Sequence, residues 1–200
     1  MIKIKQFIEG SLEANGYVIY HKNGGECFII DPGYNAKRYI KFISEEALKV
    51  KGILLTHYHY DHVGAVQRLK GDYGCPVFLH RQDINRYKGD VDIPLEGGEV
   101  LLLDDEKVEV LHTPGHTLGG VCYKLPESKV IFTGDTIFNV DIGRTDFVDS
   151  DPYLMLDTMI NVVNTWKNDY TLYPGHGESA TMKYIRDYNL EFIDAQSNSR

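Results

Sequence analysis

The stretch THYHYDHVGA, residues 56–65, places several side chains that bind metal ions within a few positions. The candidate ligands are His57, His59, Asp61 and His62. In an extended segment, side chains at positions i and i+2 point the same way, so His57 and His59 can hold one ion together. Asp61 and His62 come where a helix is expected to begin, so they can face a second ion beside the first.

Three further segments carry a ligand-type side chain directly after an apolar run. They are TPGHTLGG with His116, FTGDTIF with Asp135, and YPGHGE with His176. Glycine or proline flanks each of these residues, so loops at strand ends can gather them into one site. Five histidines and two aspartates exceed the three protein ligands of one catalytic zinc ion. The surplus predicts two divalent ions per chain, with one aspartate bridging them.

Imidazole and carboxylate ligands suit zinc, iron and manganese. Zinc is the first choice, and iron or manganese are the alternatives. The remaining histidines are interpreted as structural, because His21 falls in a predicted hairpin turn and His80 and His112 at strand ends. His112 also precedes TPGH closely, so it could orient a ligand.

The elements that must position these residues are strands followed by helices, in two successive groups. Alternating or buried apolar runs predict strands at residues 2–7, 17–20, 27–30, 52–56, 76–79, 99–103, 107–112, 120–124, 130–133 and 170–173. Helices are predicted at residues 35–48, 63–70, 81–87 and 180–192, and another begins at Pro152 with Asp151 as its N-cap. This order predicts an α+β fold in which two similar sheets pack together with helices outside.

The 200 residues predict one domain, residues 1–200, whose polar end at residues 194–200 is expected to fray. Cys27, Cys75 and Cys122 lie beside apolar neighbours and form no CxxC pair, which predicts buried reduced thiols. The net charge of −8 argues against nucleic acid as a partner. No apolar run is long enough for a membrane span, and the first residues lack the apolar core of a signal peptide. We therefore expect a cytoplasmic monomer or small homo-oligomer.

The four motifs resemble those of the metallo-β-lactamase-fold hydrolases, and among them the small glyoxalase II-like (hydroxyacylglutathione hydrolase-like) branch. The segment Asp31-Pro32-Gly33 is also similar to the first strand-end motif of that family. The resemblance extends over essentially the whole chain. It implies a four-layer αββα sandwich with the metals at one edge. It implies that one metal is held by His57, His59 and His116, the other by Asp61, His62 and His176, and that Asp135 bridges them.

Two features indicate which branch of this family the sequence resembles. Glyoxalase II itself carries a further C-terminal helical region that helps to bind glutathione, and none is expected here because the sequence ends soon after YPGHGE. The segment DIGRTDF, residues 141–147, resembles a GRxDF stretch shared by short glyoxalase II-like proteins and persulfide dioxygenases. Arg144 is a candidate anchor for an anionic substrate, or else a structural partner of Asp146. Tyr60 is a candidate for the wall of the substrate pocket, with packing as its alternative role.

The histidines needed as ligands leave no Ser-His-Asp or Cys-His nucleophile. Metal-bound water is therefore the expected nucleophile, with a bridging hydroxide oriented by Asp61 and Asp135 as the catalytic carboxylates. No spare general acid is apparent, which favours thioesters because a thiolate leaves without protonation. The expected function is a dinuclear thioesterase acting on small hydroxyacyl-thiol esters of the S-lactoylglutathione type.

The same residues also permit other activities. A mononuclear iron persulfide dioxygenase, with His57, His59, His116 and Asp135 around the ion, is the first alternative. A lactonase or another ester hydrolase of the same fold is the second. A β-lactamase is disfavoured because no export signal is present and Asp135 is atypical of that branch. A non-enzymatic binding module would need a lost ligand, and none is missing.

Overall fold

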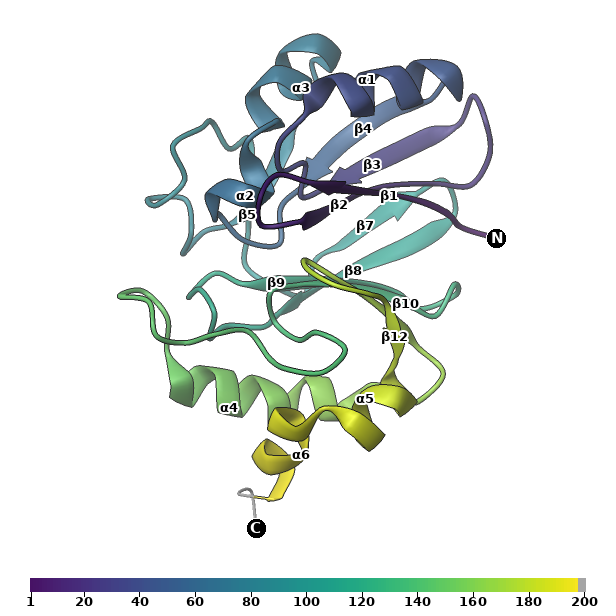
Figure 1. Cartoon of the computed structure of the whole chain (residues 1–200). Coiled ribbons are helices and arrows are strands. Elements are labelled where there is room, and N and C mark those ends of the chain that lie inside the picture. Colours follow the sequence, from purple (N-terminus) through teal and green to yellow (C-terminus); the bar gives the residue numbers. More distant parts are fainter. Residues whose placement is uncertain (198–200) are drawn as a thin grey trace.

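The computed structural model describes residues 1–197 as two six-stranded sheets packed face to face, with helices on both outer sides (Figure 1). The first sheet runs in chain order through β1 (Lys3–Glu9), β2 (Ala14–Tyr20), β3 (Glu26–Ile30), β4 (Lys49–Leu54), β5 (Val77–His80) and β6 (Ile93–Leu95). The second sheet contains β7 (Val100–Leu103), β8 (Glu106–His112), β9 (Val121–Leu125), β10 (Val130–Gly134), β11 (Thr171–Pro174) and β12 (Ala180–Thr181), also as neighbours in chain order.

The helices form the two outer layers. On the first sheet lie α1 (Ala36–Glu45) and α3 (Val66–Tyr73), preceded by the short α2 (Tyr60–Val63). On the second sheet lie α4 (Pro152–Asn161), the 3₁₀ turn η1 (Val163–Thr165), α5 (Met182–Tyr188) and α6 (Leu190–Ser197). Three separate hydrophobic clusters fill the spaces between successive layers. The four-layer αββα sandwich of an α+β fold is thereby confirmed.

Strand direction brings several loops to one edge of the sandwich. β3, β4 and β5 pair in parallel, and so do β10 and β11. The carboxyl ends of parallel neighbours meet at the same edge, where connecting loops commonly carry functional residues. The segments after β4, β10 and β11 contain the HxHxDH motif, Asp135 and His176.

Two predicted helices differ from the structure. Residues 81–86 form successive turns instead of a helix, and the buried Asp83 side chain among them binds the backbone and hydroxyl of a distant loop. The helix predicted at residues 180–192 is divided at Asn189, whose backbone is extended (φ −80°, ψ 100°). The Asn189 side chain accepts a hydrogen bond from Phe192 N and so starts a second helix.

Two further differences concern an edge strand and the chain end. The sequence did not predict β6, because Pro94 argues against a strand, yet an edge position tolerates proline. The fraying expected from residue 194 is not found at residues 194–197, because α6 continues through Ser197. The rest of that tail, residues 198–200, lies outside the described residues.

Other expectations can be compared directly with the structure. Cys27, Cys75 and Cys122 are buried and unpaired, which confirms the interpretation as thiols. Among the described helices, none has the length and apolar character needed to cross a membrane.

Candidate metal centre

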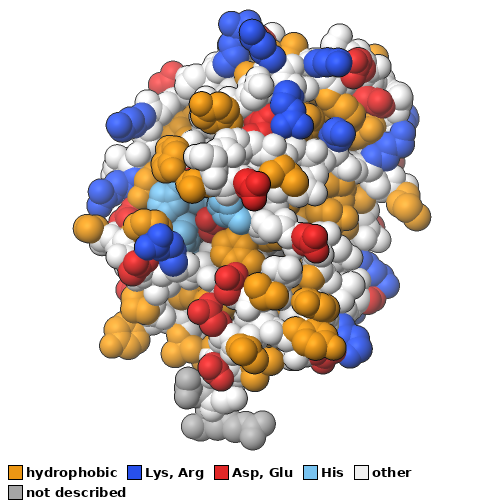
Figure 2. Space-filling view, viewed as in Figure 1, with side chains coloured by type: hydrophobic (Ala, Val, Ile, Leu, Met, Phe, Trp, Pro, Cys, Tyr) orange, Lys and Arg blue, Asp and Glu red, His pale blue; other side chains and the backbone are white. Residues whose placement is uncertain are grey.

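All seven side chains predicted as ligands meet at the edge of the sandwich where the parallel strands end. His57 and His59 follow β4, Asp61 and His62 lie in α2, His116 lies between β8 and β9, Asp135 follows β10, and His176 follows β11. Figure 2 shows histidine side chains at a hollow in this face, with acidic and hydrophobic side chains around it. Loops from both sheets therefore build the centre.

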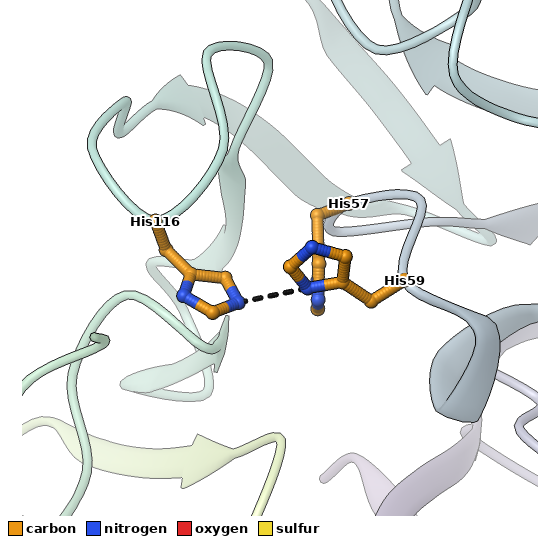
Figure 3. A group of neighbouring side chains, drawn as sticks. All are labelled: His57, His59 and His116. Atoms are coloured by element: carbon orange, nitrogen blue, oxygen red, sulfur yellow. Dashed lines mark hydrogen bonds between the residues drawn. The ribbon is translucent and has the colours of Figure 1, made fainter. Parts of the chain in front are cut away.

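The first cluster consists of the imidazoles of His57, His59 and His116. One nitrogen from each lies within 4.8 Å of the other two. His116 Nε2 is only 3.0 Å from His59 Nδ1, and the rings face one another from two separate loops (Figure 3). Within residues 1–197, His57 Nε2 is buried and has no hydrogen-bond partner. Such a convergence of nitrogen lone pairs fits a bound cation, because buried polar atoms otherwise need hydrogen-bond partners.

The second cluster consists of Asp61, His62 and His176, whose ligand atoms also lie within 4.8 Å of one another. His62 Nε2 is 3.3 Å from His176 Nε2. Asp61 Oδ2 is 3.3 Å from His176 Nε2 and 3.5 Å from His62 Nε2. A carboxylate and two imidazoles are a common donor set for catalytic divalent metals, so this cluster fits a second ion.

Asp135 lies between the two clusters. Its Oδ1 is 3.4 Å from His62 Nε2, and its Oδ2 is 3.5 Å from both His116 Nε2 and His176 Nε2. The Oδ1 atom is buried without a hydrogen-bond partner among the described residues. The carboxylate therefore contacts histidines of both clusters, as a bridging ligand must.

The outward-facing nitrogens of several imidazoles have fixed partners. His116 Nδ1 lies 2.9 Å from the Arg144 carbonyl, and His176 Nδ1 lies 2.9 Å from the Leu12 carbonyl. A carbonyl accepts, so in each case Nδ1 carries a proton and Nε2 is directed toward the centre. Partners of this kind fix the tautomer and orientation of metal-binding histidines.

Asp31 orients one histidine of each cluster, and the sequence did not identify it as a site residue. This buried carboxylate accepts hydrogen bonds from Thr56 N (2.7 Å) and Thr56 Oγ1 (2.5 Å). Thr56 Oγ1 is in turn 3.0 Å from His57 Nδ1, while Asp31 Oδ2 is 3.3 Å from His62 Nδ1. The sequence signal was the strand-end segment Asp31-Pro32-Gly33, where Asp31 adopts a left-handed backbone with φ 45°.

Electrostatics distinguish the two clusters. Burial lowers the pKa of His57, and burial together with His116 lowers the pKa of His59 to about 4. At neutral pH these imidazoles are uncharged and offer free lone pairs. In the second cluster burial opposes protonation, but contacts with Asp135 and Asp61 outweigh it and raise the pKa of His176 to about 10. In the second cluster a protonated His176 therefore pairs with the two carboxylates. A metal cation that bound there would displace the His176 proton.

Asp83 connects the His116 loop to the turn after β5. Its buried carboxylate accepts hydrogen bonds from Thr117 Oγ1 (2.8 Å) and Gly119 N (2.7 Å). Burial raises the pKa of Asp83 to about 6, although both hydrogen bonds act in the opposite direction. The segment that carries His116 is thus tied to the first sheet by a carboxyl group that titrates below neutrality.

This raised pKa predicts how the stability of the protein depends on pH. The folded state binds the Asp83 proton more tightly than the unfolded state, so wild type loses this contribution as pH rises from about 4 through about 6. An Asp83→Asn variant has no such proton. We expect the free energy of unfolding of Asp83→Asn, minus that of wild type, to be about 2 kcal/mol larger at pH 7.5 than at pH 4.5, so the variant gains stability relative to wild type as pH rises. Urea denaturation at both pH values measures it.

The control for this experiment is Gln82→Ala, an exposed neighbour in the same turn without a titratable group. It should change the free energy of unfolding equally at the two pH values. A pH-independent difference between Asp83→Asn and wild type would contradict the assignment.

The two residues predicted to contact substrate lie beside the centre. Tyr60 is 74% exposed at the start of α2. The Arg144 side chain forms two 2.7 Å hydrogen bonds to Asp146 and stacks over Phe147, with 4.5 Å from its guanidinium carbon to the ring centroid. The structure thus contains the pairing that was the alternative role of Arg144. The Phe147 ring lies 5.2 Å from the His59 ring, centroid to centroid, and forms a wall beside the first cluster.

The other histidines lie outside both clusters. His21 Nε2 contacts Glu106 at 3.1 Å. His80 and His112 stack with ring centroids 4.1 Å apart. His112 Nε2 lies 3.0 Å from the Leu118 carbonyl, so it contacts the loop that carries His116 without facing the centre.

An αββα sandwich with two His/Asp clusters at the edge of its sheets defines a class of metal-dependent proteins. The chain belongs to the metallo-beta-lactamase superfamily, whose family model matches residues 10–181. It is similar to the hydroxyacylglutathione hydrolase GloC of Haemophilus influenzae, with 36% identity over 84% of this chain and 88% of that protein.

Two solved structures share the fold closely. The crystal structure of BLEG-1 B3 metallo-beta-lactamase has 31% sequence identity and a TM-score of 0.88, covering 94% of this chain and 98% of the other. The crystal structure of TTHA1623 in a di-iron-bound form has 29% identity and a TM-score of 0.82, covering 92% and 98%. The expectation of a metallo-β-lactamase fold with glyoxalase II-like relatives is confirmed.

Proposed function

We propose that this chain is a dinuclear metal-dependent thioesterase that hydrolyses small hydroxyacyl-thiol esters of the S-lactoylglutathione type in the cytoplasm. The observation that carries the proposal is the pair of His/Asp clusters that share the Asp135 carboxylate. Similarity to a protein named hydroxyacylglutathione hydrolase supports the substrate class. Zinc is the proposed metal, and the di-iron form of TTHA1623 keeps iron as an alternative.

Two divalent ions at this centre would polarise the scissile carbonyl and supply a water-derived nucleophile at neutral pH. The chain contributes the rest. His57, His59 and His116 would hold one ion, and Asp61, His62 and His176 the other. The Asp61 and Asp135 carboxylates accept hydrogen bonds only, so they would orient the attacking water by its protons.

The leaving group also favours a thioester. The Tyr58 hydroxyl, which lies between two ligands in the sequence, donates to Asp149. The Arg144 guanidinium is paired with Asp146. The Tyr58 proton is thus engaged with Asp149, and a guanidinium does not give up its proton near neutral pH, whereas a thiolate departs without protonation. We propose that Tyr60 and Phe147 line the path by which substrate reaches the centre.

The test combines metal analysis of the purified protein with a substrate panel. We expect two ions per chain and hydrolysis of S-lactoylglutathione or a related thioester, with weaker or no activity on lactones. One iron per chain with oxygen consumption on glutathione persulfide would instead establish the dioxygenase. A β-lactam belongs in the panel because BLEG-1 is described as a B3 metallo-beta-lactamase. Absence of thioester hydrolysis by the zinc-loaded and iron-loaded proteins would refute the proposal.

A further inference from the structure

The junction between α5 and α6 lies against the loop that joins Asp135 to Arg144. Asn189 in this junction is fully buried, and its side-chain amide donates to the carbonyls of Phe138 (3.2 Å) and Asp141 (2.8 Å). Its Oδ1 accepts from Phe192 N at 2.9 Å. All the hydrogen-bonding groups of one buried side chain are thus used, and two of the bonds go to the same short loop.

That loop is a small hairpin, residues 137–142. Ile137 and Ile142 form an antiparallel bridge, and Phe138 N donates to the Asp141 carbonyl at 2.9 Å. A second contact from α6 reaches it, because Glu191 Oε2 accepts from Ile142 N at 2.9 Å. Hydrogen bonds from Asn189 and Glu191 therefore hold both sides of the hairpin.

Both ends of this hairpin lead to the metal centre. Asp135 precedes it, and the Arg144 carbonyl that receives the His116 Nδ1 proton follows it. Gly143 packs so closely that a Cβ there would lie 1.8 Å from the Asp135 carbonyl oxygen and 3.2 Å from His116 Cβ. The Phe138 ring also contacts the His176 ring, with centroids 6.1 Å apart. A shift of the hairpin would therefore move groups that orient ligands of both clusters.

We infer that Asn189 is a positioning residue of the metal centre. It acts through the 137–142 hairpin, assisted by Glu191, to place the Asp135 carboxylate and the Arg144 carbonyl that selects the His116 tautomer. The inference rests on the metal centre of the proposed function. Groups that orient metal ligands in this way typically change metal affinity 10–100-fold when removed.

The test measures zinc affinity by competition with a chromophoric chelator, and the His116 tautomer by nitrogen NMR of the zinc-free protein. We expect Asn189→Ala to weaken zinc binding at least about 10-fold and to lose the single Nδ1-protonated form of His116. Glu191→Ala should have a smaller effect in the same direction, and Glu191→Gln should restore binding because its amide oxygen still accepts from Ile142 N.

Arg186→Ala is the matched control. Arg186 holds the same helices to the backbone of Asn164 and Trp166 and does not contact the hairpin. It should leave zinc affinity within about twofold of wild type, a change of about 0.4 kcal/mol or less. Equal zinc affinity and an unchanged His116 tautomer in Asn189→Ala would overturn the inference.

Two outcomes need a second measurement. If Asn189→Ala does not fold, Glu191→Ala decides, and unchanged affinity in that variant overturns the inference. If wild type binds neither zinc nor iron, the proposed function fails, while the tautomer of His116 in the metal-free variants still decides whether Asn189 positions it.

Discussion

Hydrolysis by an Asp135→Asn variant is expected to fall at least about 1000-fold, an increase of about 4 kcal/mol in the activation barrier. Asp135 is the carboxylate that contacts histidines of both clusters. Although burial opposes ionisation, His62 and His176 hold its pKa far below the ordinary range. An asparagine removes that charge and directs amide hydrogens toward the position of a cation. Steady-state kinetics and metal counting measure the two consequences, and we expect fewer than two ions per chain.

The matched control is Asp169→Asn, the same chemical change in an exposed ion pair with Lys129 at 2.6 Å. Hydrolysis and metal content should match wild type in that variant. If Asp135→Asn kept two ions and near-normal turnover, Asp135 would not be the shared ligand.

Removing the metal ions is expected to lower the melting temperature by at least about 15 °C. An ion that binds only the folded state at a thousandfold excess over its Kd contributes about 4 kcal/mol to the free energy of unfolding. For a chain of this size, each kcal/mol corresponds to roughly 2–4 °C. Two such ions contribute about 8 kcal/mol together, which corresponds to the expected loss of at least about 15 °C. Thermal unfolding with and without chelator, followed by zinc addition, measures the shift.

Substitution of one ligand distinguishes this effect from nonspecific zinc binding. His62→Gln should lose about half of the zinc-dependent shift, because the first cluster keeps its three imidazoles. His21→Gln should keep the full shift in melting temperature, since His21 lies outside both clusters and contacts Glu106 instead. Equal shifts in both variants would show that the stabilising ions bind elsewhere.

The convergence of the candidate ligands could be predicted from the sequence because each one has a local signal. His57 and His59 alternate in an extended segment, and Asp135 and His176 each follow an apolar strand and a turn. The positioning residues have no such signal. Asn189 and Phe138 are 51 positions apart, and Asp83 and Thr117 are 34 apart, so only the folded chain shows that they are partners.

The fold was predictable to a similar degree. Alternating and buried apolar runs identified most strands, and their order indicated two sheets with helices outside. The errors occur where a side chain competes with local propensity. Asp83 bonds to the His116 loop from within the turns at residues 81–86, and Asn189 caps a new helix where periodicity predicted a continuous one. Pro94 lies in an edge strand, where its missing N–H is tolerated.

Each cluster draws its ligands from both sheets, and this has a consequence for biosynthesis. His176 follows His62 by 114 positions, so it leaves the ribosome well after His57, His59, Asp61 and His62. His176 reaches the second cluster only after β11 has paired with β10, next to Asp135. A nascent chain therefore has no complete donor set for the second cluster until β11 is in place. A cation would thus bind the second cluster only after β10 and β11 have paired.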